Sequence, residues 1–138
     1  MIAVDTNLLV AFLVDRDREQ TAQALRLLSE HPVHVPVTAV LELAWVLQAK
    51  SMGWSRATIA DAIGRLFDQP SIDFAERASL VRALDLYRAG FDFADAVHLV
   101  LADRASVAGF ATFDRDLVRR ANSDFPGLKV AAPQDFAA

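Results

Sequence analysis

The chain opens with the stretch Ile2-Ala3-Val4-Asp5-Thr6-Asn7-Leu8-Leu9. Its three apolar residues, followed at once by a carboxylate, are typical of a buried central strand that ends at Asp5. Thr6 and Asn7 are residue types that cap helices, and apolar side chains recur at helical spacing from Leu8 to Leu13. The stretch therefore predicts a strand, an acid at the end of that strand, and a helix: the first unit of an α/β fold.

The remainder of the chain repeats this alternation. Short apolar runs predict further strands at 33–35, 72–74, 110–112 and 129–131, and helical patterns occupy 21–29, 39–50, 55–67, 76–88, 93–107 and 116–121. Strands that alternate with helices imply a parallel sheet covered on both faces. Because no internal repeat, linker or low-complexity tract interrupts the pattern, we expect a single domain over residues 1–138.

Composition narrows the classes of protein to consider. Of the 138 residues, 54% are apolar and 23% charged, and the mean hydropathy is +0.25, which is enough to close a core. The longest uncharged run of high hydropathy, Thr6 to Val14, has nine residues, whereas a membrane span needs about 20. No basic segment or cleavage site precedes Asp5, so we expect no secretory signal and a cytoplasmic location.

The charge balance and the cysteine content exclude several kinds of site. The absence of cysteine rules out disulfides, thiolate nucleophiles and cysteine-ligated zinc. With 18 acidic and 14 basic residues, the chain is not held to nucleic acid by simple counter-charge. An enzyme that reaches phosphates through bound cations remains compatible with this balance.

Four carboxylates stand in apolar surroundings. Asp5 lies between two apolar runs, and Glu42 is the only charge between Val35 and Leu47. Asp95 begins a largely apolar helical stretch, and Asp114 follows the apolar run 110–113. Burying an unpaired carboxylate costs several kcal/mol. Four such positions in one short chain therefore indicate a single structural or functional reason for all of them.

A parallel sheet can explain why these four carboxylates occur, because it can bring them to one edge. Asp5 and Asp114 follow predicted strands, and the carboxyl ends of parallel strands are where α/β sheets bind ligands. Asp95 and Glu42 lie near the starts of helices and can reach the same edge. Converging carboxylates repel one another unless a cation neutralises them, and an all-oxygen ligand set favours Mg²⁺ or Mn²⁺ over zinc. Such a site suits phosphodiester hydrolysis.

These positions carry a resemblance to a known family. The motif Val4-Asp5-Thr6-Asn7 resembles the opening motif of PIN-domain nucleases. Glu42, the pair Asp95-Ala96 and the triplet Thr112-Phe113-Asp114 resemble the remaining acidic positions of that family. Their order and spacing, together with the chain length, most resemble the VapC-type toxins of bacterial toxin–antitoxin pairs.

The resemblance implies a three-layer α/β/α sandwich with a mainly parallel central sheet. It also implies a Mg²⁺- or Mn²⁺-dependent endoribonuclease that acts on RNA and is inhibited by a small cognate antitoxin, with Asp5, Glu42, Asp95 and Asp114 as catalytic metal ligands. Apolar helix residues between Leu8 and Leu66 exceed the needs of one small core, and a homodimer or an antitoxin groove would cover the excess.

Several neighbouring residues have two interpretations each. Asp92 and Asp116 either support the metal site or lie on a solvated surface. Thr112, Thr6 and Asn7 either play local structural roles or orient the acids and contact the substrate. Arg115 and Arg119 either contact RNA phosphates or form an ordinary helix surface. Trp45 either packs against the core or a partner or stacks on a base.

Two other functions remain as alternatives. One is a catalytically silent PIN-like binding module. The other is a phosphoryl-transfer domain with Asp5 as phosphoacceptor. Haloacid-dehalogenase-type phosphatases need a second Asp where Asn7 stands, and response-regulator receivers need a Lys at the end of the last strand, whereas Lys129 begins it.

Overall fold

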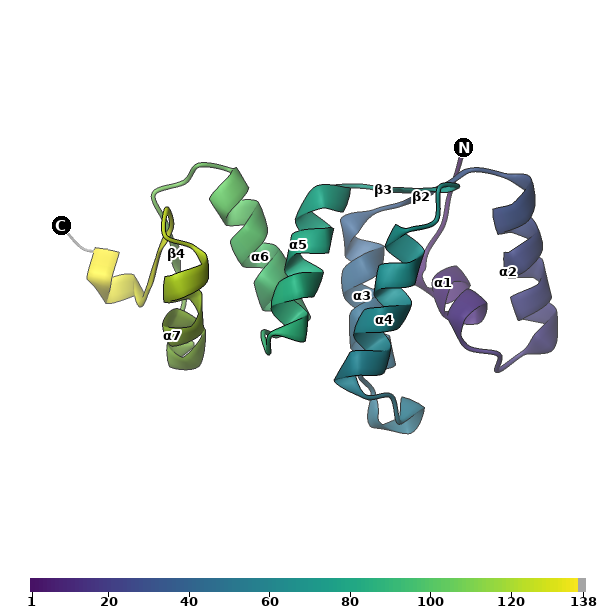
Figure 1. Cartoon of the computed structure of the whole chain (residues 1–138), viewed down its shortest axis with the longest axis horizontal. Coiled ribbons are helices and arrows are strands. Elements are labelled where there is room, and N and C mark those ends of the chain that lie inside the picture. Colours follow the sequence, from purple (N-terminus) through teal and green to yellow (C-terminus); the bar gives the residue numbers. More distant parts are fainter. Residues whose placement is uncertain (137–138) are drawn as a thin grey trace.

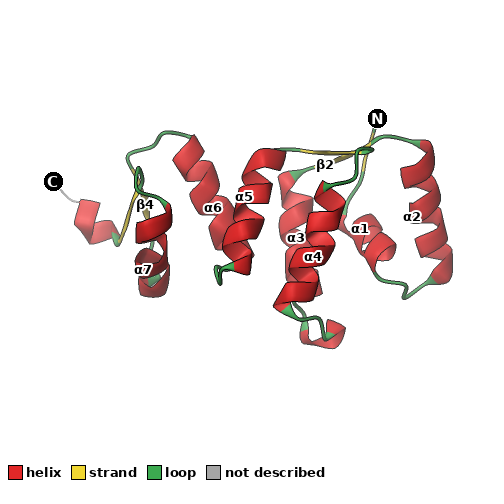
Figure 2. Ribbon diagram, in the orientation of Figure 1, coloured by secondary structure: helices red, strands yellow, loops and turns green. Residues whose placement is uncertain are grey.

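A computed structural model describes residues 1–136 as a chain of seven α-helices and five short parallel strands. The strands are β1 (Ile2–Ala3), β2 (Val33–Val35), β3 (Ile72–Phe74), β4 (Gly109–Ala111) and β5 (Lys129–Ala131). The helices are α1 (Thr6–Leu13), α2 (Arg18–Glu30), α3 (Val37–Leu47), α4 (Arg56–Phe67), α5 (Arg77–Arg88), α6 (Phe93–Arg104) and α7 (Arg115–Asp124). Two 3₁₀ turns, η1 (Lys50–Met52) and η2 (Pro133–Phe136), complete the chain (Figure 2). The predicted α/β class is confirmed.

Capping residues account for most of the helix boundaries. Ser55 accepts a hydrogen bond from the Thr58 amide at the start of α4, as its residue type predicts. Asp17 accepts from two amides of α2, so that helix begins earlier than the apolar pattern indicates. Helix α6 ends at Arg104, before the position predicted, because Ser106 adopts a left-handed backbone (φ 56°).

The strands form two sheets, where the resemblance implied one central sheet. One sheet has the order β1-β2-β3 and the other pairs β4 with β5. Figure 1 shows a long molecule, with α1 and α2 at one end, β4 and α7 at the other, and α3 to α6 between them. The expectation that residues 2–4 form a buried central strand is wrong: β1 is an edge strand, and Ile2 is 39% exposed.

Helix packing explains why β4 and β5 lie far from β1. On α5, Arg82 donates to a carboxylate oxygen of Asp103 on α6 (2.8 Å) and to the Asp124 carbonyl at the end of α7 (3.3 Å). Its guanidinium also stacks over the Phe125 ring, 4.7 Å from the centroid. These contacts hold the unit formed by β4, α7 and β5 against α5 and α6.

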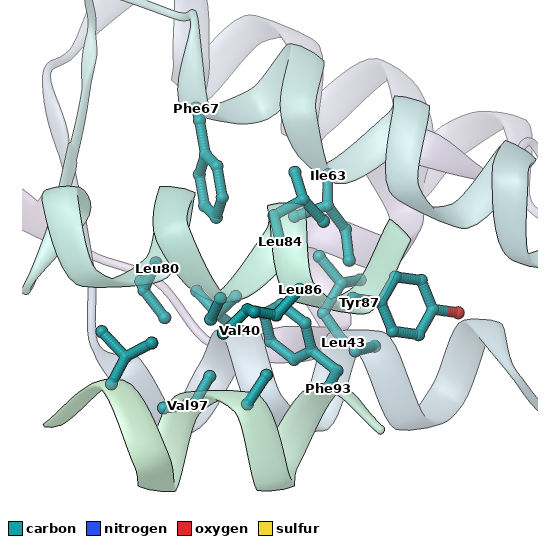
Figure 3. Packing of buried hydrophobic residues seen from close by; sticks show 14 of the residues in the cluster. Val40, Leu43, Ile63, Phe67, Leu80, Leu84, Leu86, Tyr87, Phe93 and Val97 are labelled. Atoms are coloured by element: carbon teal, nitrogen blue, oxygen red, sulfur yellow. The ribbon is translucent and has the colours of Figure 1, made fainter. Parts of the chain in front are cut away.

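The core is built mainly between helices (Figure 3). Leu43 of α3, Leu84 of α5 and Val97 of α6 are all buried. The rings of Tyr87 and Phe93 meet edge to face at 5.9 Å, joining α5 to α6. In the part of the chain that the structure describes, none of the helices combines the length and the hydropathy of a membrane-spanning segment.

Truncating the centre of this core should destabilise the fold. Leu43 is 1% exposed, so we expect Leu43→Ala to lower the free energy of unfolding by about 3 kcal/mol through lost burial and a residual cavity. Urea unfolding followed by circular dichroism measures the change. The matched control, Leu25→Ala, removes a side chain that is 49% exposed and should stay within about 0.5 kcal/mol of wild type. Equal losses in both variants would contradict this description of the core.

Candidate metal centre

Asp5 occupies the junction between β1 and α1. Its Oδ1 accepts a hydrogen bond from the Leu8 amide at 3.1 Å, which makes Asp5 the N-cap of α1. Thr6 and Asn7, expected as the capping residues, are already inside the helix, because the Asp5 carboxylate reaches the free amide first. The cap uses one carboxylate oxygen and leaves the other exposed at the end of the strand.

Glu42 is tied to the same junction through Thr6. The buried Thr6 hydroxyl lies 3.2 Å from Glu42 Oε2 and 3.3 Å from the Ala39 carbonyl. Thr6 thus positions Glu42 of α3 against the start of α1, next to Asp5. We call Asp5 and Glu42 the N-terminal acid pair. This contact supports the interpretation of Thr6 as a residue that orients the acids.

Three more carboxylates gather where α6 and α7 begin. Asp92 is the N-cap of α6 and accepts from the Asp95 amide at 3.1 Å, so Asp95 lies in the first turn of that helix. Asp114 caps α7 by accepting from the Leu117 amide at 3.1 Å. Burial raises the pKa of Asp95, the charges of Asp92 and Asp114 raise it further, and His98 lowers it. We call Asp92, Asp95 and Asp114 the C-terminal acid cluster.

Of the residues around Asp114, one orients its carboxylate and the others lie on the surface of α7. The Thr112 hydroxyl accepts a hydrogen bond from the Asp114 amide at 3.0 Å and so fixes the turn that presents the carboxylate. Asp116 forms an ion pair with Arg119 on the exposed surface of α7. No ion pair of Arg115 occurs among residues 1–136, so its guanidinium is free for other contacts.

None of the five acids of the pair and the cluster forms an ion pair within residues 1–136. Arginine or histidine side chains instead pair with the acids Glu30, Asp61, Asp73, Glu76, Asp103 and Asp116. Carboxylate oxygens that form no ion pair with a basic side chain are the type of ligand that Mg²⁺ and Mn²⁺ prefer.

The acids of one chain nevertheless lie in two separate sets. Within residues 1–136, no group of three or more acidic or histidine side chains is arranged to hold a metal ion. Asp5 and Glu42 share one junction, and Asp95 and Asp114 share another. Convergence of all four acids therefore stays a prediction.

Two exposed aromatic side chains border these sets. Trp45, one turn after Glu42 on α3, is 77% exposed, so it does not pack in the core. Phe113 is 89% exposed and adjoins Asp114. The sequence pattern placed Phe113 in an apolar strand, and no local signal separates it from that strand, which ends at Ala111.

Comparison with known proteins gives one family. The family model described as PIN domain matches residues 2–123, which include all five acids. No curated protein matches the chain.

The electrostatic link within the C-terminal acid cluster is testable. Asp92→Asn keeps a good helix cap but removes a negative charge, so the pKa of Asp95 should fall toward its ordinary value while staying above it, because burial remains. A pH titration of the Asp95 carboxyl carbon by NMR, without divalent metal, measures this. Asp73→Asn, a change on β3, is the control and should leave that pKa in place. A pKa of Asp95 that stays constant or rises in Asp92→Asn would show that the two charges do not interact.

Proposed function

The chain belongs to the PIN-domain family, and from this we propose that it is an endoribonuclease dependent on Mg²⁺ or Mn²⁺. The observation that carries the proposal is that carboxylates without an ion pair in the described chain gather at the end of β1 and at the starts of α6 and α7. A catalytically silent binding module would have no use for so many uncompensated charges, because like charges held close together destabilise the fold.

The proposed metal ligands are Asp5, Glu42, Asp95 and Asp114. A divalent ion bound by them would supply charge stabilisation at the phosphate and promote the ionisation of an attacking water. The N-capping hydrogen bonds hold Asp5 and Asp114 by one oxygen each and leave the second oxygen for the ion. Asp92 orients the first turn of α6, on which Asp95 lies.

Other residues of the chain would hold the RNA. Arg115 directly follows Asp114 and lines a hollow together with Thr112 and Phe113. Its guanidinium suits a backbone phosphate next to the metal site, and the exposed Phe113 ring offers a surface on which a base can stack. Arg119 is engaged by Asp116 and would contribute after that surface ion pair opens.

We further propose a VapC-like toxin role, with a small antitoxin as inhibitor and cytoplasmic RNA as substrate. The sequence resemblance to VapC-type toxins supports this role. The exposed Trp45 also supports it, because it lines a hollow with Arg16 and Val46 that a partner protein can cover.

Cleavage of total RNA by the purified chain tests the proposed activity. We expect discrete fragments with Mg²⁺ or Mn²⁺ and none with EDTA, and Asp5→Asn should reduce the rate about a hundredfold or more while the protein stays folded. Asp61→Asn, which removes a charge paired with Arg88, is the matched control and should cleave at the wild-type rate. Full activity of Asp5→Asn, or cleavage in EDTA, would overturn the proposal.

Arg115 provides a separate test of RNA binding. Arg115→Gln removes a phosphate contact outside the metal ligands, so KM should rise several-fold with little change in kcat, and cleavage should depend less steeply on salt. Steady-state kinetics on one RNA oligonucleotide at several salt concentrations give both quantities. A fall in kcat at constant KM would assign Arg115 to the chemical step instead.

A further inference from the structure

Two strands of the molecule have an unpaired edge that carries no charge. Within residues 1–136, β1 pairs only with β2, and β4 pairs only with β5. The residues of these strands, Ile2–Ala3 and Gly109–Ala111, are all uncharged. An exposed, uncharged strand edge is a template for pairing with another strand.

The two remaining outer strands are protected. On β3, the exposed Asp73 bonds to His34 of β2 at 2.8 Å. On β5, the exposed Lys129 donates to the Asp135 carbonyl at 2.6 Å. Charged side chains on an edge strand discourage further pairing. The chain therefore leaves open the edges of β1 and β4 in particular.

Backbone geometry makes the two open edges complementary. The Ile2 amide donates to the Pro32 carbonyl just before β2, and the Val4 amide donates to the His34 carbonyl of β2. On the other sheet, the Thr112 amide donates to the Ala131 carbonyl of β5. Because alternate residues of a parallel strand face opposite neighbours, Ala3 and Ala111 direct their backbone groups to the open edges. Both alanines are exposed and small, so neither side chain obstructs a close approach.

Parallel pairing of β1 with β4 would also join the two acid sets. Asp5 lies two residues after Ala3, and Asp114 lies three residues after Ala111. Strands paired in parallel present their carboxyl ends at one edge. The N-terminal acid pair and the C-terminal acid cluster would then face each other across a single site.

The chain's own β4 is not free to make this pairing. Arg82 ties α5 to α6 and to the end of α7, and its guanidinium covers Phe125. Figure 1 shows α3 to α6 between β4 and the end that holds β1 and α1. The strand that completes β1 must therefore come from a second molecule.

We propose that two copies of this chain exchange these edges, so that β1 of each copy pairs in parallel with β4 of the other. Each half of the dimer gains a continuous sheet of order β3-β2-β1-β4-β5, the last two strands coming from the second copy. Each active site then combines Asp5 and Glu42 of one copy with Asp95 and Asp114 of the other. This inference rests on the proposed nuclease function for its catalytic consequence, but the strand pairing does not.

Mixed dimers test the shared site. Asp5→Asn and Asp114→Asn chains, each inactive alone, are co-expressed with different affinity tags and purified through both tags. One of the two sites in such a dimer is intact, so we expect about half the wild-type rate of RNA cleavage. The matched control combines Asp5→Asn with Glu42→Gln, which damages both sites and should stay inactive. No recovery in the first mixture, or recovery in the control, would overturn the proposal.

A chemical cross-link tests the pairing without relying on activity. The chain has no cysteine, so Ala3→Cys and Ala111→Cys each introduce a unique thiol. After co-expression of the two variants, a short bismaleimide should give a product of twice the chain mass that contains both tags. The pair Asp61→Cys and Ala111→Cys should give none. If a chain carrying both Ala3→Cys and Ala111→Cys is instead linked within itself, the shared site is refuted. If the cross-link forms but wild type cleaves no RNA, the dimer stands and the nuclease function fails alone.

Discussion

The structure depends on carboxylates placed where a strand or turn passes into a helix. Asp5 and Asp114 each accept a backbone amide at the start of the next helix, where unsatisfied N–H groups and the helix dipole favour a negative charge. The same hydrogen bond that begins α1 or α7 thus fixes an acid at the end of β1 or β4. Each acid has a structural role and still presents an oxygen to solvent, so capping and metal binding are compatible.

This constraint carries an electrostatic cost that the chain alone does not relieve. Several other carboxylates of the described residues pair with arginine or histidine, but the five acids at these junctions do not. Near α6 and α7, burial raises the pKa of Asp95 and the neighbouring charges of Asp92 and Asp114 raise it further. The divalent cation of the proposed function would relieve this repulsion.

Local patterns in the sequence predicted most of the elements, but not how the strands associate. Helix periods and the Ser55 cap are local signals, and the predicted helices and strands occur with shifts of a few residues. Whether β1 is central or at an edge depends on a distant strand, and a strand as short as Ile2–Ala3 has no alternation that would reveal it. Similarly, Asp92 and Asp95 both suit a helix start, and only the backbone shows that Asp92 is the cap. The acids of the candidate site could be predicted because a charge within an apolar run is a local signal in the sequence. Their division into two sets depends on how distant elements pack, which no local signal shows.

If acids from both ends of the chain bind one divalent ion, that ion should stabilise the fold only while both sets of acids are intact. Thermal unfolding of wild type, Asp5→Asn and Asp114→Asn, with and without saturating Mn²⁺, measures this. We expect Mn²⁺ to raise the Tm of wild type by several degrees and either substitution to remove most of the gain, because a ligand stabilises only the state that binds it. A gain that is absent in wild type, or that persists in full in either variant, would show that the two sets of acids do not share an ion.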